Sequence, residues 1–114
     1  MIVVTARLVV TSKQRKGLWE TLRGLPGPKR FEKGCLGYHL YQDCEDRNAL
    51  YLVEEWKTLE DLKRHICSED YKMILAAMDM CSEEPEIKIH TVSNTRGMDF
   101  LHETLQLRAM EYNR

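Results

Sequence analysis

Strand-like and helix-like patterns of hydrophobic residues follow one another along the chain. Alternating, β-branched segments predict strands, and apolar residues that recur every three or four positions predict amphipathic helices. The predicted strands span residues 2–10, 35–43, 49–57 and 86–92. The predicted helices span residues 12–25 and 59–78, and the second is restarted or bent at Ser68. The order of elements is therefore β-α-β-β-α-β.

Capping and turn residues mark the ends of these helices. Thr11 or Ser12 is a suitable N-cap for the first helix, and the Pro26–Pro28 segment is expected to stop it. Thr58 is the expected N-cap of the second helix. Asp61, three residues further on, completes a weak capping box in which each residue bonds the other's backbone N–H.

This order predicts an α+β, ferredoxin-like fold with a four-stranded antiparallel sheet and both helices on one face. One domain is expected over residues 1–93, followed by a C-terminal tail over residues 94–114. In the tail, Met98, Leu101 and Leu105 recur at helical spacing, with Asp99 as a possible cap. The tail is expected to be a helix that packs on the domain or reaches a partner chain, or else a frayed terminus.

Large apolar residues point to both faces of the predicted sheet. In the first strand Val3 and Val9 oppose the other apolar residues, and in the third strand Tyr51 and Val53 do so. Helices on one side cannot cover both faces, and an exposed apolar patch usually marks an interface. We therefore expect a homodimer formed through the sheet face.

Composition and charge narrow the possible classes of function. The 17 basic and 18 acidic residues nearly balance, which gives no overall attraction to nucleic acid or to an anionic membrane. No apolar run is long enough to span a bilayer, and the first residues lack the basic start of a secretion signal. The four cysteines form no CxxC pair, so we expect free thiols, a cytoplasmic protein and no metal.

Several short segments together resemble the antibiotic biosynthesis monooxygenase (ABM) domain family. They are Glu32-Lys33-Gly34-Cys35-Leu36-Gly37-Tyr38, Glu54-Glu55-Trp56-Lys57, Leu62-x-x-His65, Ser68-Glu69-Asp70-Tyr71, and Pro85 before the last strand. The resemblance covers residues 1 to about 92 and is specific only in combination. It implies that two such domains pair into a dimeric α/β barrel.

The resemblance also implies a chemistry, because members of this family include small oxygenases that use neither metal nor flavin. Their substrates are electron-rich phenols such as hydroquinones and anthrones, which reduce O₂ directly once ionised. Such a site needs an apolar pocket, aromatic walls and a group that accepts a proton. The expected catalytic residues are His65, Trp56 and Tyr71, and the weaker pocket candidates are Tyr38, His39 and Tyr51. No cofactor is expected.

His65 is the candidate for the proton acceptor, as a neutral imidazole at the edge of an apolar helical stripe. The same position is also typical of a surface or half-buried histidine bonded to a nearby carbonyl. Trp56 and Tyr71 lie in apolar patterns that equally predict core packing.

Three alternatives remain at this point. Haem-degrading relatives of the same fold carry functional residues where this chain has Ala6, His65 and Leu75, so haem degradation is not expected. An isomerase acting on a small carbonyl compound would also use a helix histidine. A non-catalytic ligand-binding or assembly domain is compatible with the same fold.

Overall fold

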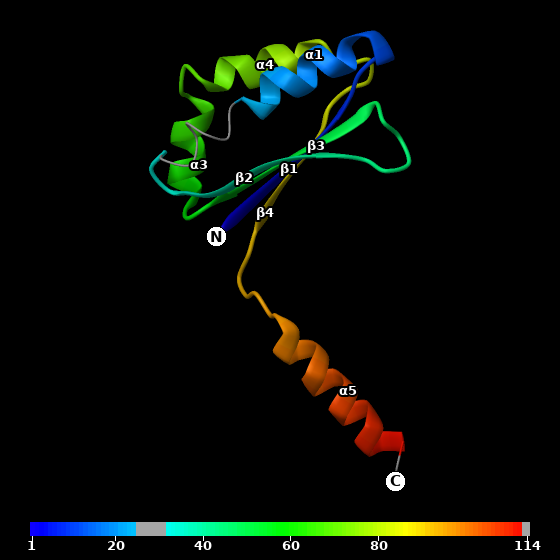
Figure 1. Ribbon diagram of the computed structural model, residues 1–114. Coiled ribbons are helices and arrows are strands. Elements are labelled where there is room, and N and C mark those ends of the chain that lie inside the picture. Colours follow the sequence, from blue (N-terminus) through cyan, green and yellow to red (C-terminus); the bar gives the residue numbers. More distant parts are fainter. Residues whose placement is uncertain (25–31, 113–114) are drawn as a thin grey trace.

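A computed structural model of the protein describes residues 1–24 and 32–112, and its centre is a four-stranded antiparallel sheet (Figure 1). The strands are β1 (Ile2–Val9), β2 (Cys35–Gln42), β3 (Ala49–Trp56) and β4 (Glu86–Thr91), in the order β2-β3-β1-β4. The helices are α1 (Ser12–Arg23), α3 (Leu59–Ile66), α4 (Tyr71–Asp79) and α5 (Met98–Tyr112). Helices α1, α3 and α4 lie on the same side of the sheet.

The predicted α+β, ferredoxin-like order is confirmed, with one refinement. The second predicted helix is two helices, α3 and α4, because the chain turns between Cys67 and Asp70. There the Ser68 hydroxyl donates to the carbonyl of His65 at 2.6 Å, which closes the end of α3. The predicted helix stop at residues 26–28, and Leu25 before it, lie outside the described residues.

The core lies between the sheet and the three helices. Along β1 every second residue is buried, and the buried set includes Val4 and Leu8. Leu22 of α1 and Ile74 of α4 close the other side, each almost inaccessible to solvent. The alternation read from the sequence therefore identifies the helix-covered face correctly.

The opposite face of the sheet has no helix over it and carries half-buried side chains, as the two-sided pattern predicts. Val3 and Val9 of β1 lie there, beside Tyr51 and Val53 of β3. We call this surface the open face. All residues of β4, which forms one edge of the sheet, are exposed.

A β-bulge in β2 corrects one sequence-based expectation. The pattern places Cys35 on the same side of its strand as His39, but the register slips between Cys35 and Gly37. Cys35 pairs with the buried Trp56, whereas His39 pairs with Val53 of the open face. The extra residue at the bulge moves the side chains before it to the other face of the sheet.

Helix α5 extends away from the rest of the chain, at the opposite end of the molecule from α1 and α4 (Figure 1). The radius of gyration is 18.0 Å, whereas a compact chain of this length has about 13 Å. The tail is thus a helix, and it does not pack on the domain. Asp99 lies in its first turn, and the cap position before the helix is Gly97.

Candidate functional site

The site is built around His65, which lies in the last turn of α3. The start of that helix is fixed by Thr58, whose hydroxyl oxygen accepts a hydrogen bond from the Asp61 backbone N–H at 3.1 Å. This half of the predicted capping box is confirmed. The Asp61 carboxylate accepts from the Thr58 hydroxyl at 2.8 Å, where the box predicts the Thr58 backbone N–H as donor. Two hydrogen bonds to the Asp61 carboxylate hold its pKa below the usual value. The bond from Arg64 has the largest effect, and the bond from Thr58 comes second.

A tight turn brings Glu32 to the same place. Gly34 has a φ of +82°, a left-handed conformation that favours glycine. Its carbonyl accepts from the Lys57 N–H at 2.8 Å, which ties the turn to the end of β3. A Cβ at Gly34 would collide with the carboxyl group of Asp61. The turn therefore packs directly on the start of α3.

Two carboxylates face the two ring nitrogens of His65, and the imidazole is fully buried. The Nδ1 atom lies 3.1 Å from Oε2 of Glu32, whose side chain is 22% exposed. The Nε2 atom lies 2.7 Å from Oε1 of Glu54, a side chain that is only 4% exposed. The second contact is an ion-pair distance without hydrogen-bond alignment.

Glu32, His65 and Glu54 form a continuous group of polar contacts, because a carboxylate oxygen stands at each of the two imidazole nitrogens. We call these three residues the acid–imidazole triad.

Aromatic rings enclose the imidazole. The ring of Trp56 stacks on His65 with a centroid distance of 4.5 Å and an interplanar angle of 29°. The ring of Tyr71 meets it edge-on at 5.2 Å. Trp56 is fully buried, and Tyr71, the first residue of α4, is partly exposed. The structure thus brings together the three residues that the sequence analysis selected as catalytic.

Tyr38 of β2 lies next to Glu54 of this site. It pairs with Glu54 across the two strands, so both side chains point into the helix-covered face. Burial raises the pKa of the Tyr38 phenol, and the charge of Glu54 is the second largest cause of this rise. The phenol therefore stays a hydrogen-bond donor at neutral pH. Burial and Glu54 also raise the pKa of Tyr71.

Two donors near the triad have no hydrogen-bond partner among the described residues. They are the Tyr38 hydroxyl and the Trp56 Nε1–H. Buried polar atoms in folded proteins are nearly always paired, with protein, water or a ligand. Each of these donors is available to an oxygen atom of water or of a ligand.

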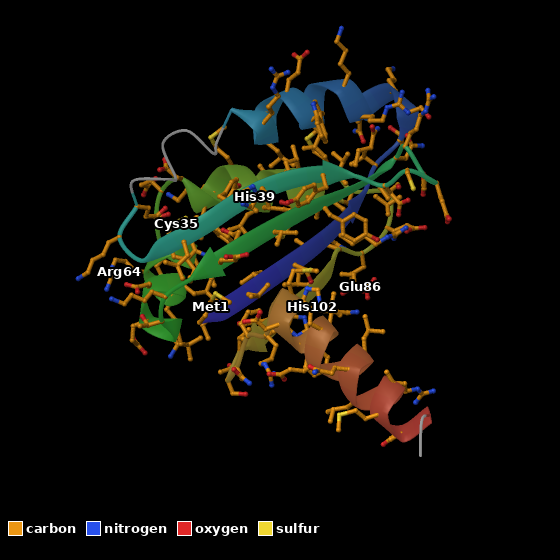
Figure 2. All side chains as sticks on the ribbon, turned by 60° about the horizontal axis from the view of Figure 1, so that its bottom comes forward. Met1, Cys35, His39, Arg64, Glu86 and His102 are labelled. Carbon is orange, nitrogen blue, oxygen red and sulfur yellow. The ribbon has the colours of Figure 1, made fainter. Side chains whose placement is uncertain are left out.

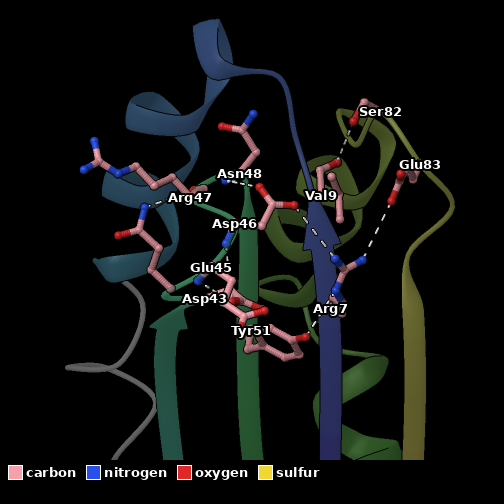
Figure 3. A network of polar contacts seen from close by, with 11 residues as sticks. Arg7, Val9, Asp43, Glu45, Asp46, Arg47, Asn48, Tyr51, Ser82 and Glu83 are labelled. Carbon is pink, nitrogen blue, oxygen red and sulfur yellow. Dashed lines mark hydrogen bonds and ion pairs between the residues drawn. The ribbon is translucent and has the colours of Figure 1, made fainter.

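The other two pocket candidates lie elsewhere. His39 and Tyr51 are on the open face, across the sheet from the triad, so they do not line one pocket with His65 in the same chain. The Tyr51 hydroxyl accepts a hydrogen bond from Arg7 at 3.1 Å in a polar network that also reaches Asp46 and Glu83 (Figure 3). His39 stacks on Tyr41 with ring centroids 6.1 Å apart, and it lies along β2 in Figure 2.

Sequence reasoning did not select Glu32 or Glu54 as functional residues. A signal for Glu54 was available, because it falls between Leu52 and Trp56 on the face that the alternation marks as buried. A carboxylate in such a position requires a partner. Glu32 carries no comparable signal, since its position depends on the conformation of Gly34.

A groove of about 330 Å³ lies along the start of β2 and includes both Tyr38 of the site and His39 of the open face. It is lined by residues 35–39. Tyr38 contributes to this groove and also lies within electrostatic reach of Glu54. None of the four principal grooves in the described part of the chain is lined by His65, Trp56 or Tyr71. Tyr38 is thus the residue that this groove shares with the site.

Two further observations concern other classes of site. Over residues 1–24 and 32–112, no three His, Cys, Asp or Glu side chains are arranged to hold a metal ion. Within the same residues, no helix has the length and apolar character that crossing a bilayer requires.

The fold is that of a ferredoxin-like α+β domain, and comparison with known proteins gives the family. Residues 1–77 match the family model described as antibiotic biosynthesis monooxygenase. The match covers more than half of the chain, so the chain belongs to the ABM family. The resemblance seen in the sequence motifs is confirmed.

The chain is also similar to solved structures and to one curated protein. A conserved protein from Methanosarcina mazei is 29% identical, with a TM-score of 0.73, and the match covers 78% of this chain and 89% of that one. A structure described as a putative antibiotic biosynthesis monooxygenase from Deinococcus radiodurans has a TM-score of 0.78 at 17% identity, over 85% and 97% of the two chains. An uncharacterised Synechocystis protein is 24% identical over 98 residues, which are 85% of this chain and 67% of that one.

Proposed function

We propose that the protein is a cofactor-independent monooxygenase that oxidises an electron-rich aromatic or quinol with O₂. The observation that carries this proposal is the fully buried His65, held between Glu32 and Glu54 and packed on Trp56 and Tyr71. Membership of the ABM family supports the reaction class.

The chemistry needs a proton acceptor and a place for the oxygen of the substrate. A phenol or quinol gives its proton to the acid–imidazole triad, and the resulting anion passes one electron to O₂. The two radicals combine into a peroxide, which loses water and leaves one oxygen atom in the product. For an anthrone the balance is anthrone plus O₂ giving anthraquinone plus water. The Tyr38 hydroxyl, whose residue lines the groove, is suited to donate a hydrogen bond to the substrate oxyanion.

This proposal changes the role expected for His65. The sequence predicts a single imidazole as the proton acceptor, whereas in the structure both nitrogens of His65 face carboxylates. We assign proton uptake to the triad as a whole. Glu32, the more exposed carboxylate, is its route to solvent.

The groove beside Tyr38 supports an entry route for the substrate. Its volume of about 330 Å³ lies at the lower end of the range for small-molecule sites. We propose that the ring of the substrate enters there and that its oxygen displaces the Tyr38 phenol from the neighbourhood of Glu54.

Oxygen uptake by metal-stripped, flavin-free protein with hydroquinones and anthrones tests the proposal. We expect saturable uptake that falls by about 100-fold in Glu54→Gln and in His65→Ala. Glu54→Gln conserves side-chain volume, which limits the risk of misfolding. Lys63→Ala, an exposed position on the same helix, is the matched control and should retain full uptake. Uptake no faster than autoxidation, by folded protein, would contradict the proposal.

We also propose that the chain forms a homodimer through the open face, giving a dimeric α/β barrel. Support comes from Val3, Val9 and Val53, which lie on a face that no helix of the chain covers. Sedimentation velocity at micromolar concentration should give twice the 13.4 kDa mass of one chain. Val53→Glu should shift the protein toward monomer, and a monomeric wild type would contradict this proposal.

One observation favours a second candidate function. The close packing of Trp56 and Tyr71 on His65 is also typical of a core, so a non-catalytic ligand-binding domain of the same fold accounts for it as well. In that case the ligands bind without consuming O₂, so the uptake experiment separates the two. An isomerase for a small carbonyl compound would likewise turn over without O₂.

The exposed thiols of Cys44 and Cys67 support a cytoplasmic location.

A further inference from the structure

Helix α5 has two apolar stripes that the rest of the described chain, residues 1–24 and 32–97, leaves exposed. Met98, Leu101 and Leu105 follow one another on one side, and Phe100 and Leu107 lie on the opposite side. These side chains are 47–68% exposed. Figure 2 shows the side chains of α5 pointing outward around the helix, into solvent. A helix with apolar residues on opposite sides is normally buried against other parts of a protein.

The length of α5 leads to the same conclusion. It has 15 residues, and isolated helices of that length are marginal in water. Local contacts give it some support, since Arg96 forms an ion pair with Glu103 at 2.8 Å and lies 5.2 Å from the centre of the Phe100 ring. Such exposed contacts are individually weak. Most of the stability of α5 must therefore come from packing against another surface.

The same chain presents an apolar groove on its other side. It runs between α1 and α4 and has a volume of about 290 Å³. Small residues form part of its lining and longer apolar ones the remainder: Gly17, Leu18, Met73, Ala76, Ala77 and Met80. A Cβ added at Gly17 would meet no atom within 4 Å, so the groove is open at this point. Methionine side chains adapt readily to an inserted apolar side chain.

Charge matches as well as shape. One basic residue, Lys13, lines the groove, whereas Arg15 and Lys16 of the same helix line a different groove. Helix α5 carries Asp99, Glu103 and Glu111 against one basic residue, Arg108. The Lys13 ammonium at the groove edge and an acidic helix favour association in a defined orientation.

We propose that α5 of one chain docks in the α1–α4 groove of a second copy of the same chain. Within one chain the two surfaces lie at opposite ends of the molecule (Figure 1), which favours a second copy as the partner. Reciprocal exchange, in which each chain's α5 fills the groove of the other, closes the pair with two identical contacts. This proposal does not depend on the oxygenase proposal.

Disulfide crosslinking between two different chains tests it. One protein carries Gly17→Cys and another carries Leu105→Cys, both with Cys44→Ser and Cys67→Ser to remove the exposed thiols. Mixed and mildly oxidised, they should form a covalent dimer joined between positions 17 and 105. The rate should exceed by about tenfold that of a control pair with Lys63→Cys in place of Gly17→Cys, because docking raises the local concentration. Position 63 is exposed on α3, outside the groove.

The outcomes that overturn the proposal are distinct. A chain that carries both cysteines and closes on itself, with no crosslink in the mixture, would show docking within one chain. No specific crosslink in either experiment would show that α5 does not occupy the groove.

As a second measurement, hydrogen exchange of α5 amides should be slow at high protein concentration and faster in Gly17→Leu, which fills the groove. Glu20→Leu, on the exposed side of α1, should leave that exchange unchanged; equal effects of the two variants would also overturn the proposal.

Discussion

At the scale of single residues, the site depends on burying charge next to its partners. An isolated buried charge is very costly, whereas a buried pair is tolerated when each group has a partner. His65 has a carboxylate at each nitrogen, and Glu54 has His65. Removing His65 leaves the Glu54 carboxylate buried without compensation, whereas His65 keeps its contact with Glu32 when Glu54 is removed. Tyr38 and Trp56 differ from this pair, because their polar atoms have no partner among the described residues.

Tyr38→Phe should therefore make the protein more stable and less able to bind its ligand. Deleting an unpaired buried hydroxyl should raise the free energy of unfolding by about 1 kcal/mol at pH 7. The folded-state pKa of this phenol lies above its ordinary value of 10.0, so Tyr38 destabilises the folded state as the pH rises above 10. The variant should lose less stability in that range.

Urea unfolding at several pH values measures both effects. Tyr41→Phe, at an exposed phenol of the same strand, is the control and should change neither. A loss of stability in Tyr38→Phe at pH 7 would mean that the hydroxyl has a partner in the folded chain.

Gly34→Ala should destabilise the protein strongly. The left-handed conformation costs an alanine about 1–2 kcal/mol, and the added Cβ would also collide with the Asp61 carboxyl group. We expect a loss of more than about 2 kcal/mol in the free energy of unfolding. Gly97→Ala, where an added Cβ meets no atom within 4 Å, should change it little. Equal effects of the two substitutions would contradict the packing of this turn on α3.

At the scale of secondary-structure elements, the start of α3 orients the site. Thr58 and Thr11 are both N-cap residues, but they differ in hydrogen bonding. The Thr58 hydroxyl accepts from the Asp61 backbone N–H in the first turn of α3, whereas the Thr11 side chain makes no such bond to α1. The expectation that Thr11 caps α1 is thus correct in position but not in hydrogen bonding. The Thr11 hydroxyl instead donates to the side chain of Gln14 at 3.3 Å.

This difference predicts unequal effects of two similar substitutions. Thr58→Ala should lower the free energy of unfolding by about 1 kcal/mol, the usual value for a lost N-cap. Thr11→Ala should cost less than about 0.5 kcal/mol. Thermal or urea unfolding of the two variants side by side measures both, and a larger effect at Thr11 would contradict the cap assignment.

The Asp61 carboxylate in the same turn predicts a dependence on pH. Its folded-state pKa is lowered, mainly by Arg64, so the ionised group stabilises the folded state at neutral pH. That contribution is lost as the pH falls below the ordinary value of 3.8 toward the folded-state pKa. Asp61→Asn should therefore be less stable than wild type above about pH 5, with the difference shrinking in acid. A difference that grows on acidification would contradict the account; Asp79→Asn, at an exposed position of α4, is the control.

Hydrophobic alternation predicted the order of the elements and the covered face, because strand and helix periods differ so clearly. It predicted the burial of Leu50, Leu52 and Trp56. The same alternation of every second residue along β3 also places Glu54 on the buried face. It could not predict the bulge that separates Cys35 from His39, since one extra residue leaves the local pattern unchanged. Nor could it place Glu32, which depends on the backbone conformation of Gly34.

At the scale of the whole molecule, the site and the surfaces that need covering are separate. The acid–imidazole triad lies inside one chain, between the sheet and α3. The open face, α5 and the α1–α4 groove all lie outside it. The proposed chemistry therefore needs only one chain, and the proposed assembly stabilises that chain by covering its apolar surfaces.

The central claim is that the triad enables direct transfer of an oxygen atom from O₂ to an aromatic substrate. The most direct measurement is a single-turnover reaction under isotopically heavy O₂, with metal-stripped, flavin-free protein and an anthrone or hydroquinone, followed by mass spectrometry of the product. We predict one heavy oxygen atom in each product molecule with the wild-type protein, and a background level with folded Glu54→Gln. Product with no heavy oxygen, or equal labelling with both proteins, would contradict the account.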